Sequence, residues 1–399
     1  MINIENFPDQ STINRLLNSF TQTHVSELEE IHWELFRKCG SVYQSKEKIR
    51  IDIDGTGISV SGKNFEFARK GYFPGQRGKS GYKITAASIP CFKGSELLYF
   101  TLDSGNVPAS SRFKDMLDKI LEKIDKEKIE FIRMDREFGY GELIDGIIKR
   151  QLKFITKAKN PKTCLKWINE NIEWEKVSDT TLCYDIGLSE IPNSKNKTRV
   201  VLLKKKVKKG IQYDAILTNI TDKKAKEIVE MYNGRQKIEA FFKEDKNCLG
   251  LKYLKVKKYD GIHSFLWFGF MVNNLLLWFR KYVLCRTPLE KLGFKSLYNV
   301  LQDMYVRFIK KDEGWELEFI YYTELQKVFI DRTIKWLMNV IPKGILNSGG
   351  KNRRLSFEGV VHSYLLFYVL LSVLGDFNYA EEEQKESVIS KLRLLFAES

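Results

Sequence analysis

Two aspartates of the sequence stand at points where predicted strands end. Asp54 follows an alternating stretch, residues 49–53, and Asp135 follows a short, nearly continuous apolar run, residues 129–134. An aspartate at a strand end is most often only a turn residue. A carboxylate at the C-terminal end of a central strand also faces the crevice in which α/β sheets bind ligands. Taken singly, each aspartate is therefore open to both interpretations.

Together, the two aspartates indicate a cation site if their strands are neighbours. Two carboxylates side by side repel each other unless a cation neutralises them, and Mg²⁺ suits an all-oxygen set of ligands. Asp52 shares the polar strand face with Asp54, and Glu137 lies close to Asp135. We rank Asp52 and Glu137 lower because each is displaced from the C-terminal edge of its strand.

A third group of charged residues has helical spacing, in the pattern Tyr232-x2-Arg235-x3-Glu239-x6-Lys246. At about 100° per residue, Arg235, Glu239 and Lys246 fall within about 40° of one another, and Tyr232 lies about 60° from Arg235. One helix stripe would then carry an aromatic ring, a guanidinium, a carboxylate and an ammonium. The plain alternative is a solvated stripe of salt bridges, which is common on helices.

The hydrophobic pattern predicts the elements that must position these residues. Period-two alternation and apolar runs predict strands, and apolar residues at helical spacing predict helices. The predicted order is β-β-β-α-β-α-β, in which the first three strands form an antiparallel meander and the first strand stops in the turn-forming run Asp54-Gly55-Thr56-Gly57. The predicted segments are strands at 48–54, 82–90 and 97–102, a helix at 110–126, a strand at 129–134, a helix at 140–150 and a strand at 154–155.

The chain as a whole divides into five predicted regions. Two short helices at the front would form either a DNA-end recognition module or a packing element. A separate β-rich subdomain is expected in the middle, and the last region is mainly helical with one possible strand at 315–322. The regions are 1–47 (helical), 48–151 (first part of the α/β domain), 152–213 (basic, β-rich insertion), 214–250 (remainder of the α/β domain, with Glu239) and 251–399 (mainly helical).

The charge of the chain favours a polyanionic partner. Lys plus Arg number 66 against 51 for Asp plus Glu, a formal net charge of +15. Residues 152–213 hold 14 Lys and Arg against 6 Asp and Glu, so more than half of the surplus lies there. Nucleic acid is a better candidate for this partner than a membrane surface. The run Lys204-Lys205-Lys206 would supply either phosphate contacts or the solvated edge of a strand.

Other classes of protein have little support in the sequence. The six cysteines are single, without a CxxC pair, and the four histidines are far apart, so a structural zinc site is not indicated. The N-terminal residues do not resemble a signal or transit peptide. Two apolar runs, 265–279 and 360–374, are shorter than the roughly 20 residues that a bilayer core requires. We therefore expect buried helices there, a soluble protein with free thiols, and no membrane partner.

Three segments in this order resemble the DDE transposases of prokaryotic insertion sequences, an RNase H-like family. They are IDIDGTG around Asp54, MDREFG around Asp135, and YNGRQKIEAFFKEDK around Glu239. The chain looks like the branch with a Tyr-Arg-Glu-Lys motif and a β-rich insertion, and the resemblance covers roughly residues 48–250. It implies an α/β fold with an RNase H-like mixed sheet flanked by helices, a β-rich insertion subdomain, and helical N- and C-terminal regions.

The resemblance also implies roles for individual residues. Asp54, Asp135 and Glu239 would be the catalytic acids and would hold two Mg²⁺ ions, with Mn²⁺ as a substitute. Tyr232, Arg235 and Lys246 would contact phosphates at the cleaved DNA end, and Trp167 or Trp174 would stack on an extruded base unless it is only a core residue of the insertion. The remaining expected DNA contacts are Arg136, Lys204, Lys205 and Lys206.

The implied function is cut-and-paste DNA transposition. Such an enzyme cleaves double-stranded DNA at the inverted-repeat ends of its element and joins them to target DNA, and a homodimer would bring the two ends together. We expect it in the prokaryotic cytoplasm, associated with the nucleoid. Two alternatives stay open, namely an RNase H-like nuclease without strand transfer and a non-catalytic, DNA-binding remnant of a transposase.

Overall fold

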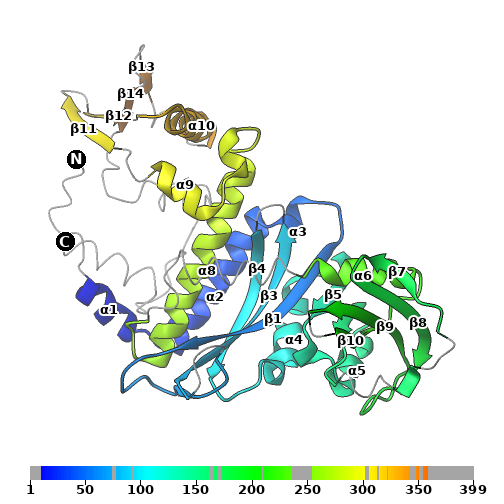
Figure 1. Cartoon of the computed structure of the whole chain (residues 1–399). Coiled ribbons are helices and arrows are strands. Elements are labelled where there is room, and N and C mark those ends of the chain that lie inside the picture. The colour runs from blue at the N-terminus through cyan, green and yellow to red at the C-terminus, as the bar shows by residue number, and fades with distance from the viewer. Residues whose placement is uncertain are drawn as a thin grey trace. The chain divides into compact units, whose positions relative to one another are not determined.

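The computed structural model consists of two compact units (Figure 1). The central unit comprises Ser41–Leu254, and the terminal unit comprises Met1–Gly40 together with Lys255–Ser399. The structure describes residues 10–73, 78–91, 94–160, 166–168, 172–208, 210–235, 254–301, 305–311, 314–320, 322–340, 347–349 and 354–357.

The central unit is built on one 10-stranded sheet. The strand order is β2-β3-β1-β5-β6-β10-β9-β8-β7, with β4 paired to β3. The strands are β1 (Ile49–Ser59), β2 (Arg69–Lys70), β3 (Ser80–Cys91), β4 (Gly94–Ser104), β5 (Ile129–Met134), β6 (Phe154–Lys157), β7 (Glu175–Ser178), β8 (Thr181–Ser189), β9 (Thr198–Val207) and β10 (Gly210–Thr218).

The first part of this sheet confirms the predicted RNase H-like arrangement. β3 pairs antiparallel with both β1 and β4, whereas β5 runs parallel to β1 and β6 runs parallel to β5. In β5, Phe131, Ile132 and Met134 are fully buried. A strand that is apolar on both faces suits the middle of a sheet that helices cover on both sides.

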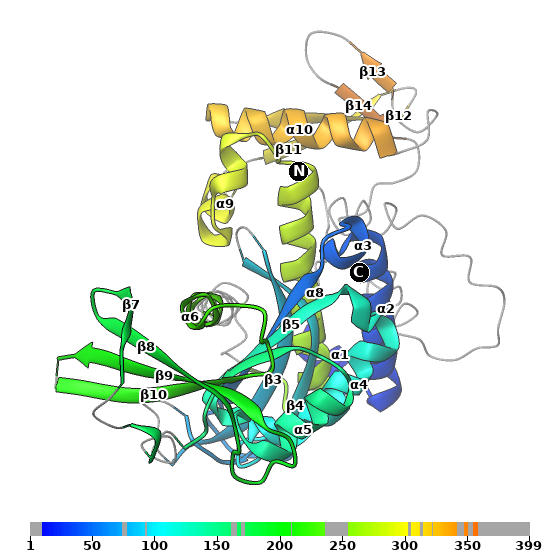
Figure 2. The same cartoon turned by 90° about the vertical axis from the view of Figure 1, so that its right-hand side faces the viewer.

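Helices cover the two faces of the sheet, as Figures 1 and 2 show from two directions. α4 (Phe113–Lys123) and α5 (Gly141–Lys149) lie on one face, and α6 (Ala225–Asn233) lies on the other. Under α6 the core contains buried aliphatic and aromatic side chains from five strands, namely Phe131, Ile155, Cys183, Val201, Leu203 and Ile216. The shorter helices of this unit are α3 (Ser41–Gln44), η1 (Ala109–Arg112), η2 (Lys126–Lys128) and η3 (Arg136–Phe138).

Strand β1 is longer than the sequence predicted. The expected turn at Asp54-Gly55-Thr56-Gly57 is wrong, because these residues pair with β3 in an unbroken register from Asp52 to Ser59. Gly57 leaves the space that the ring of Phe73 fills. What does stop at this point is the parallel pairing with β5, whose last pair is Ile53 with Met134. Asp54 therefore marks the place where two central strands separate.

The β-rich segment 152–213 does not form a sheet of its own. Its strands β7–β10 continue the main sheet, because β10 pairs antiparallel with β6 over three positions. β6 itself lies inside the predicted insertion, although it is a strand of the RNase H-like core. The sequence predicts that this segment is β-rich, but it does not predict the pairing of β10 with β6 through which the strands join the core.

The terminal unit contains two long helices that pack together. α1 (Gln10–Asn18) and α2 (Gln22–Cys39) correspond to the two predicted N-terminal helices, and α8 spans Tyr259–Tyr282. The rings of Trp267 and Trp278 on α8 lie 5.0 Å and 5.7 Å from His32 and Phe36 on α2. The remaining elements of this unit are η5 (Pro288–Lys291), α9 (Phe294–Leu301), α10 (Glu324–Val340), β11 (Tyr305–Lys311), β12 (Gly314–Ile320), β13 (Asn347–Gly349) and β14 (Arg354–Phe357).

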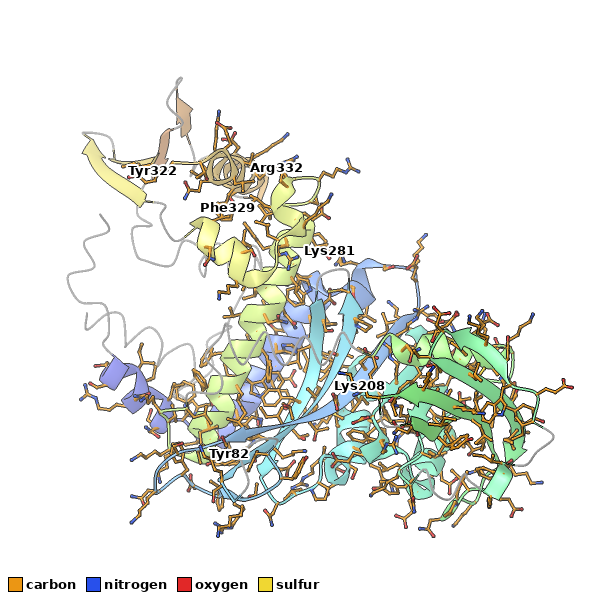
Figure 3. All side chains as sticks on the ribbon, in the orientation of Figure 1. Tyr82, Lys208, Lys281, Tyr322, Phe329 and Arg332 are labelled. Atoms are coloured by element: carbon orange, nitrogen blue, oxygen red, sulfur yellow. The ribbon has the colours of Figure 1, made fainter. Side chains whose placement is uncertain are left out.

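The C-terminal part of this unit is less helical than predicted. A four-stranded sheet of order β11-β12-β14-β13 forms there, and the sequence indicated only β12. Helix α10 packs on α8 through the ring of Phe329, which is labelled in Figure 3, and that of Phe279, at a centroid distance of 5.7 Å. Within the described residues, α8 is the one helix that is long and apolar enough to cross a membrane, and half of its most apolar window is buried. The second apolar run, 360–374, lies outside the described residues.

Candidate active site

The structure brings the two predicted aspartates together on adjacent strands. Ile53 pairs with Met134 in the parallel register of β1 and β5, so Asp54 and Asp135 are the next residue on each strand. The side chain of Asp54 is 12% exposed, and Asp135 lies at the start of η3. Two carboxylates thus meet where the strands separate, at the C-terminal end of the parallel pair.

The guanidinium of Arg235 spans these two carboxylates. Its Nη1 lies 3.0 Å from Oδ2 of Asp54, and its Nη2 lies 3.6 Å from Oδ1 of Asp135. Arg235 follows the end of α6, and its backbone N–H donates to the carbonyl oxygen of Tyr232. One cation of the protein therefore offsets the repulsion between the two acids.

Glu239 and Lys246 lie outside the described residues, so the predicted helix stripe is visible only as far as Arg235. Among the residues that are described, no group of three His, Cys, Asp or Glu side chains could hold a metal ion. Asp54 and Asp135 supply oxygen donors of the kind that Mg²⁺ prefers, and the arginine already bound to them shows that a cation is accommodated there. The two acids fit part of a divalent metal site, and Glu239 would be its third ligand.

The two competing acids have other partners. Asp52 is fully buried and accepts two hydrogen bonds from Arg133, at 2.7 and 2.8 Å. Glu137 accepts a hydrogen bond of 2.6 Å from the backbone N–H of Ala109 and lies 3.8 Å from the ammonium of Lys83. Both carboxylates thus hold the structure around the site together, in agreement with their lower rank.

Tyr232 is buried in the core beneath α6. Its side chain is about 5% exposed, and its hydroxyl has no hydrogen-bond partner among the described residues. Burial raises the pKa of this phenol well above its usual range. The ammonium of Lys157 lies 5.2 Å from its ring. In this arrangement the tyrosine faces the sheet, so the predicted phosphate contact would require it to move.

A cluster of cations begins directly after Asp135; it includes the expected DNA contacts Arg136 and Lys205, but the sequence did not show that they lie together. We call Arg136, Lys157 and Lys205, which surround the buried Asp214, the basic cluster. Arg136 Nη2 and Lys157 Nζ lie 2.8 Å and 3.4 Å from Oδ2 of Asp214. Burial, together with the charges of Lys157 and Arg136, lowers the pKa of Lys205. Three cations share one carboxylate, so the cluster keeps a surplus of positive charge.

Strand geometry separates the three lysines of the predicted run. Lys204 and Lys205 are consecutive on β9 and therefore point to opposite faces of the sheet. Lys204 lies against Trp174, with its Nζ 5.6 Å from the ring, whereas Lys205 belongs to the basic cluster. Lys206 is exposed. The three lysines therefore do not form one patch.

The two candidate tryptophans have different surroundings. Trp174 is half-buried and packs against Tyr184 and Tyr213, whose ring centroids lie 6.4 Å and 6.1 Å away. Trp167 is also half-buried and lies 4.7 Å from the ammonium of Lys166. Trp174 therefore forms part of an aromatic surface on β8 and β10, at the distances that favour tilted packing.

The mixed sheet and the two acids on its neighbouring parallel strands agree with the predicted RNase H-like core. The family model described as "Transposase DDE domain group 1" matches residues 3–332. The chain belongs to this family of DDE transposases, and the predicted family is confirmed. DDE transposases generally use divalent metal ions.

Two solved structures are similar to this chain at 14% sequence identity. One is the cryo-EM structure of a piggyBac transposase synaptic complex with hairpin DNA, which covers 61% of this chain and 50% of that one with a TM-score of 0.34. The other is the NurA nuclease from Sulfolobus solfataricus, which covers 52% of this chain and 85% of that one with a TM-score of 0.24. The chain thus spans half the length of the piggyBac chain. No curated protein matches it.

Proposed function

We propose that this protein is the transposase of a prokaryotic insertion sequence, which cleaves DNA at the inverted-repeat ends of its element and joins those ends to target DNA. The observation that carries the proposal is the pair Asp54 and Asp135, placed on neighbouring parallel strands and spanned by one cationic side chain. The family match supports the same reaction class. The proposal requires that Glu239 complete the site.

In this proposal Asp54, Asp135 and Glu239 donate oxygen ligands to two divalent ions, Mg²⁺ or in its place Mn²⁺. When bound, such ions supply activation of an attacking water or 3′-hydroxyl and neutralisation of the leaving oxygen. Arg235 holds the two aspartates in place before metal binds, and then offers its guanidinium to a phosphate of the cleaved end. Lys246 contributes a further point charge to that end.

The DNA interface is proposed to follow the positive charge beside the acids. Arg136 and Lys205 belong to the basic cluster, and Lys157 adds a third cation there. Phosphate contacts at this place would position the DNA backbone next to the acids. Trp174, or alternatively Trp167, would stack on an unpaired base, and Lys204 and Lys206 would contact flanking phosphates.

A homodimer that holds two DNA ends is part of the proposal, because both ends of an element must be cut and joined together. We place it in the prokaryotic cytoplasm, on the nucleoid. The DNA beside the gene offers a first test, since an intact element carries paired inverted repeats flanked by short direct repeats. Without such repeats at the gene, the proposal of an intact element fails.

The biochemical test compares three acid-to-amide variants on DNA that carries those repeats. Asp54→Asn, Asp135→Asn and Glu239→Gln should each lower Mg²⁺-dependent cleavage at least 10³-fold while the affinity for DNA stays within about threefold, because each removes a metal ligand and leaves the basic surface intact. Asp118→Asn is the matched control, because Asp118 lies on α4 and pairs with Arg150 at the end of α5. Full cleavage by any of the three would refute the assignment.

The same experiment separates the alternatives. Cleavage without joining to target DNA would identify a nuclease of the same fold. Binding to the repeats without Mg²⁺-dependent cleavage by the unmodified protein would identify a DNA-binding remnant.

A further inference from the structure

A buried ion pair lies directly behind the two acids. Asp52 and Arg133 are cross-strand partners in the parallel register of β1 and β5. Nε and Nη2 of Arg133 donate to the two carboxylate oxygens of Asp52, at 2.7 and 2.8 Å, and both side chains are almost completely excluded from solvent. Asp54 and Asp135 each follow two residues later on the same strands, so the pair fixes the strand ends that present them.

The third nitrogen of Arg133 reaches across to α6. Nη1 donates to the carbonyl oxygen of Met231, in the last turn of that helix. A Cβ added at Gly234 would clash with Nη1 of Arg133 and lie 3.3 Å from its Cζ. The backbone of Gly234 is helical, with φ −61°, so glycine is needed there for space and not for its conformation.

Gly234 directly precedes Arg235, which spans the two acids, and the chain reaches Glu239 four residues later. One guanidinium therefore joins β1, β5 and the end of α6, two residues before Arg235. We propose that Arg133, with Asp52 and the space left at Gly234, positions Arg235 relative to Asp54 and Asp135, so that the two acids are held ready for a metal ion. The inference rests on the proposed function, because it assigns these residues to the assembly of the same metal site.

The chemistry of the contact explains why an arginine is required. The three acceptors are the two carboxylate oxygens of Asp52 and the carbonyl oxygen of Met231, which lie in two directions. The planar guanidinium of one arginine can donate to all three, whereas the ammonium of a lysine on its flexible stem cannot. Removing the arginine altogether would leave the carboxylate of Asp52 buried without a partner, which is strongly destabilising. The conservative change Arg133→Lys, and the change Gly234→Ala that leaves both charges in place, are therefore the informative variants.

The other end of α6 offers a matched control. Arg199 pairs with Asp185 at 2.6 Å, and its Nη1 donates to the carbonyl oxygens of Ile220 and Lys223, each at 2.8 Å, just before the helix begins. This ion pair also combines a buried arginine with backbone contacts next to α6, although its aspartate is partly exposed. It does not adjoin Asp54 or Asp135, so Arg199→Lys should loosen the helix start and spare the site.

The experiment measures Mn²⁺ affinity of the full chain by electron paramagnetic resonance, without DNA, together with thermal unfolding. Arg133→Lys and Gly234→Ala should each weaken Mn²⁺ binding at least tenfold. Arg199→Lys should keep the Mn²⁺ affinity within twofold of that of the unmodified protein, even if it lowers the Tm as much as the other two variants do. On cleavable DNA the first two variants should lower kcat at least tenfold with KM within twofold. Mn²⁺ affinity within twofold of the unmodified protein in Arg133→Lys and Gly234→Ala, or an equal loss in all three variants, would overturn the inference.

These readouts keep the inference separate from the proposed function. If the unmodified protein binds Mn²⁺ but cleaves no DNA, the proposed function fails, and the positioning role is decided by the Mn²⁺ affinities alone. If the unmodified protein binds no Mn²⁺, the positioning role is overturned as well, because there is then no metal site to assemble.

Discussion

Tyr232 and Arg235 belong to one sequence motif, yet they have different surroundings. Arg235 contacts both acids, whereas the phenol of Tyr232 is buried among aliphatic side chains beneath α6. The spacing alone predicted a shared stripe, because an uninterrupted helix would keep the two side chains about 60° apart. α6 ends at Asn233, so the helix that this arithmetic assumes stops between them. The two residues should accordingly respond differently to substitution.

We expect Tyr232→Phe to keep DNA affinity within twofold and to leave the free energy of unfolding unchanged or higher by about 1 kcal/mol. The change removes a buried hydroxyl that has no partner among the described residues and keeps the ring that fills the core. Filter binding and urea unfolding of the variant measure these two quantities. A fall in DNA affinity of tenfold or more would show instead that the tyrosine leaves the core to contact a phosphate.

At the scale of elements, helix α8 carries a histidine that lies between two aromatic rings of the same helix. His263 on α8 stacks against Trp267, and burial lowers the pKa of its imidazole to about 4 from an ordinary value of 6.5. Between about pH 4 and pH 6.5, the unfolded chain binds a proton at His263 that the folded chain does not bind. Unfolding is therefore favoured progressively as the pH falls through this range.

Acidification from pH 7.5 to pH 4.5 should destabilise the terminal unit through this histidine by up to roughly 3 kcal/mol, at about 1.36 kcal/mol for each pKa unit. The variant His263→Phe keeps an aromatic ring in the same place and cannot be protonated. Its Tm should consequently fall less on acidification than that of the unmodified protein. Equal losses of Tm in both proteins would assign the acid sensitivity to other groups.

The strands and helices also show which parts of the fold could be predicted from the sequence. Alternation and apolar runs predicted β1, β3, β4 and β5 and their order, since those patterns are local. The pairing of β10 with β6 could not be predicted, because it joins residues about 60 positions apart and leaves no local signal. The basic cluster was missed for the same reason, since Lys157 and Asp214 meet only across that pairing. The two acids were accessible to prediction because they directly follow the last residue pair of the parallel strands β1 and β5.

At the scale of the whole molecule, the net charge of +15 should govern DNA affinity. Every phosphate that a cation neutralises releases condensed counterions, so affinity falls with salt in proportion to the number of such contacts. A half-buried lysine with a lowered pKa, such as Lys205, gains a partner when a phosphate binds beside it. An exposed lysine elsewhere contributes only to the overall positive electrostatic potential of the protein.

We therefore expect Lys205→Gln to weaken DNA binding and to reduce the slope of log K against log salt by about one. Lys119→Gln is the matched control, since Lys119 is an exposed lysine on α4 that pairs with Glu122. Both variants remove one charge, so a purely global charge effect would change the two slopes equally. Fluorescence anisotropy with labelled DNA from about 50 to 300 mM salt, over which the Debye length shortens roughly twofold, measures the slopes.

The joining of β10 to β6 has a consequence for synthesis on the ribosome. The core strands emerge in an order that lets each pair with an earlier neighbour, but β6 is completed more than 50 residues before β10. Until β10 emerges, β6 presents an open strand edge, and β7, β8 and β9 have no link to the core. Nascent chains that stall in this interval expose pairing surface to other chains, so the yield of folded protein depends on rapid passage through residues 158–209.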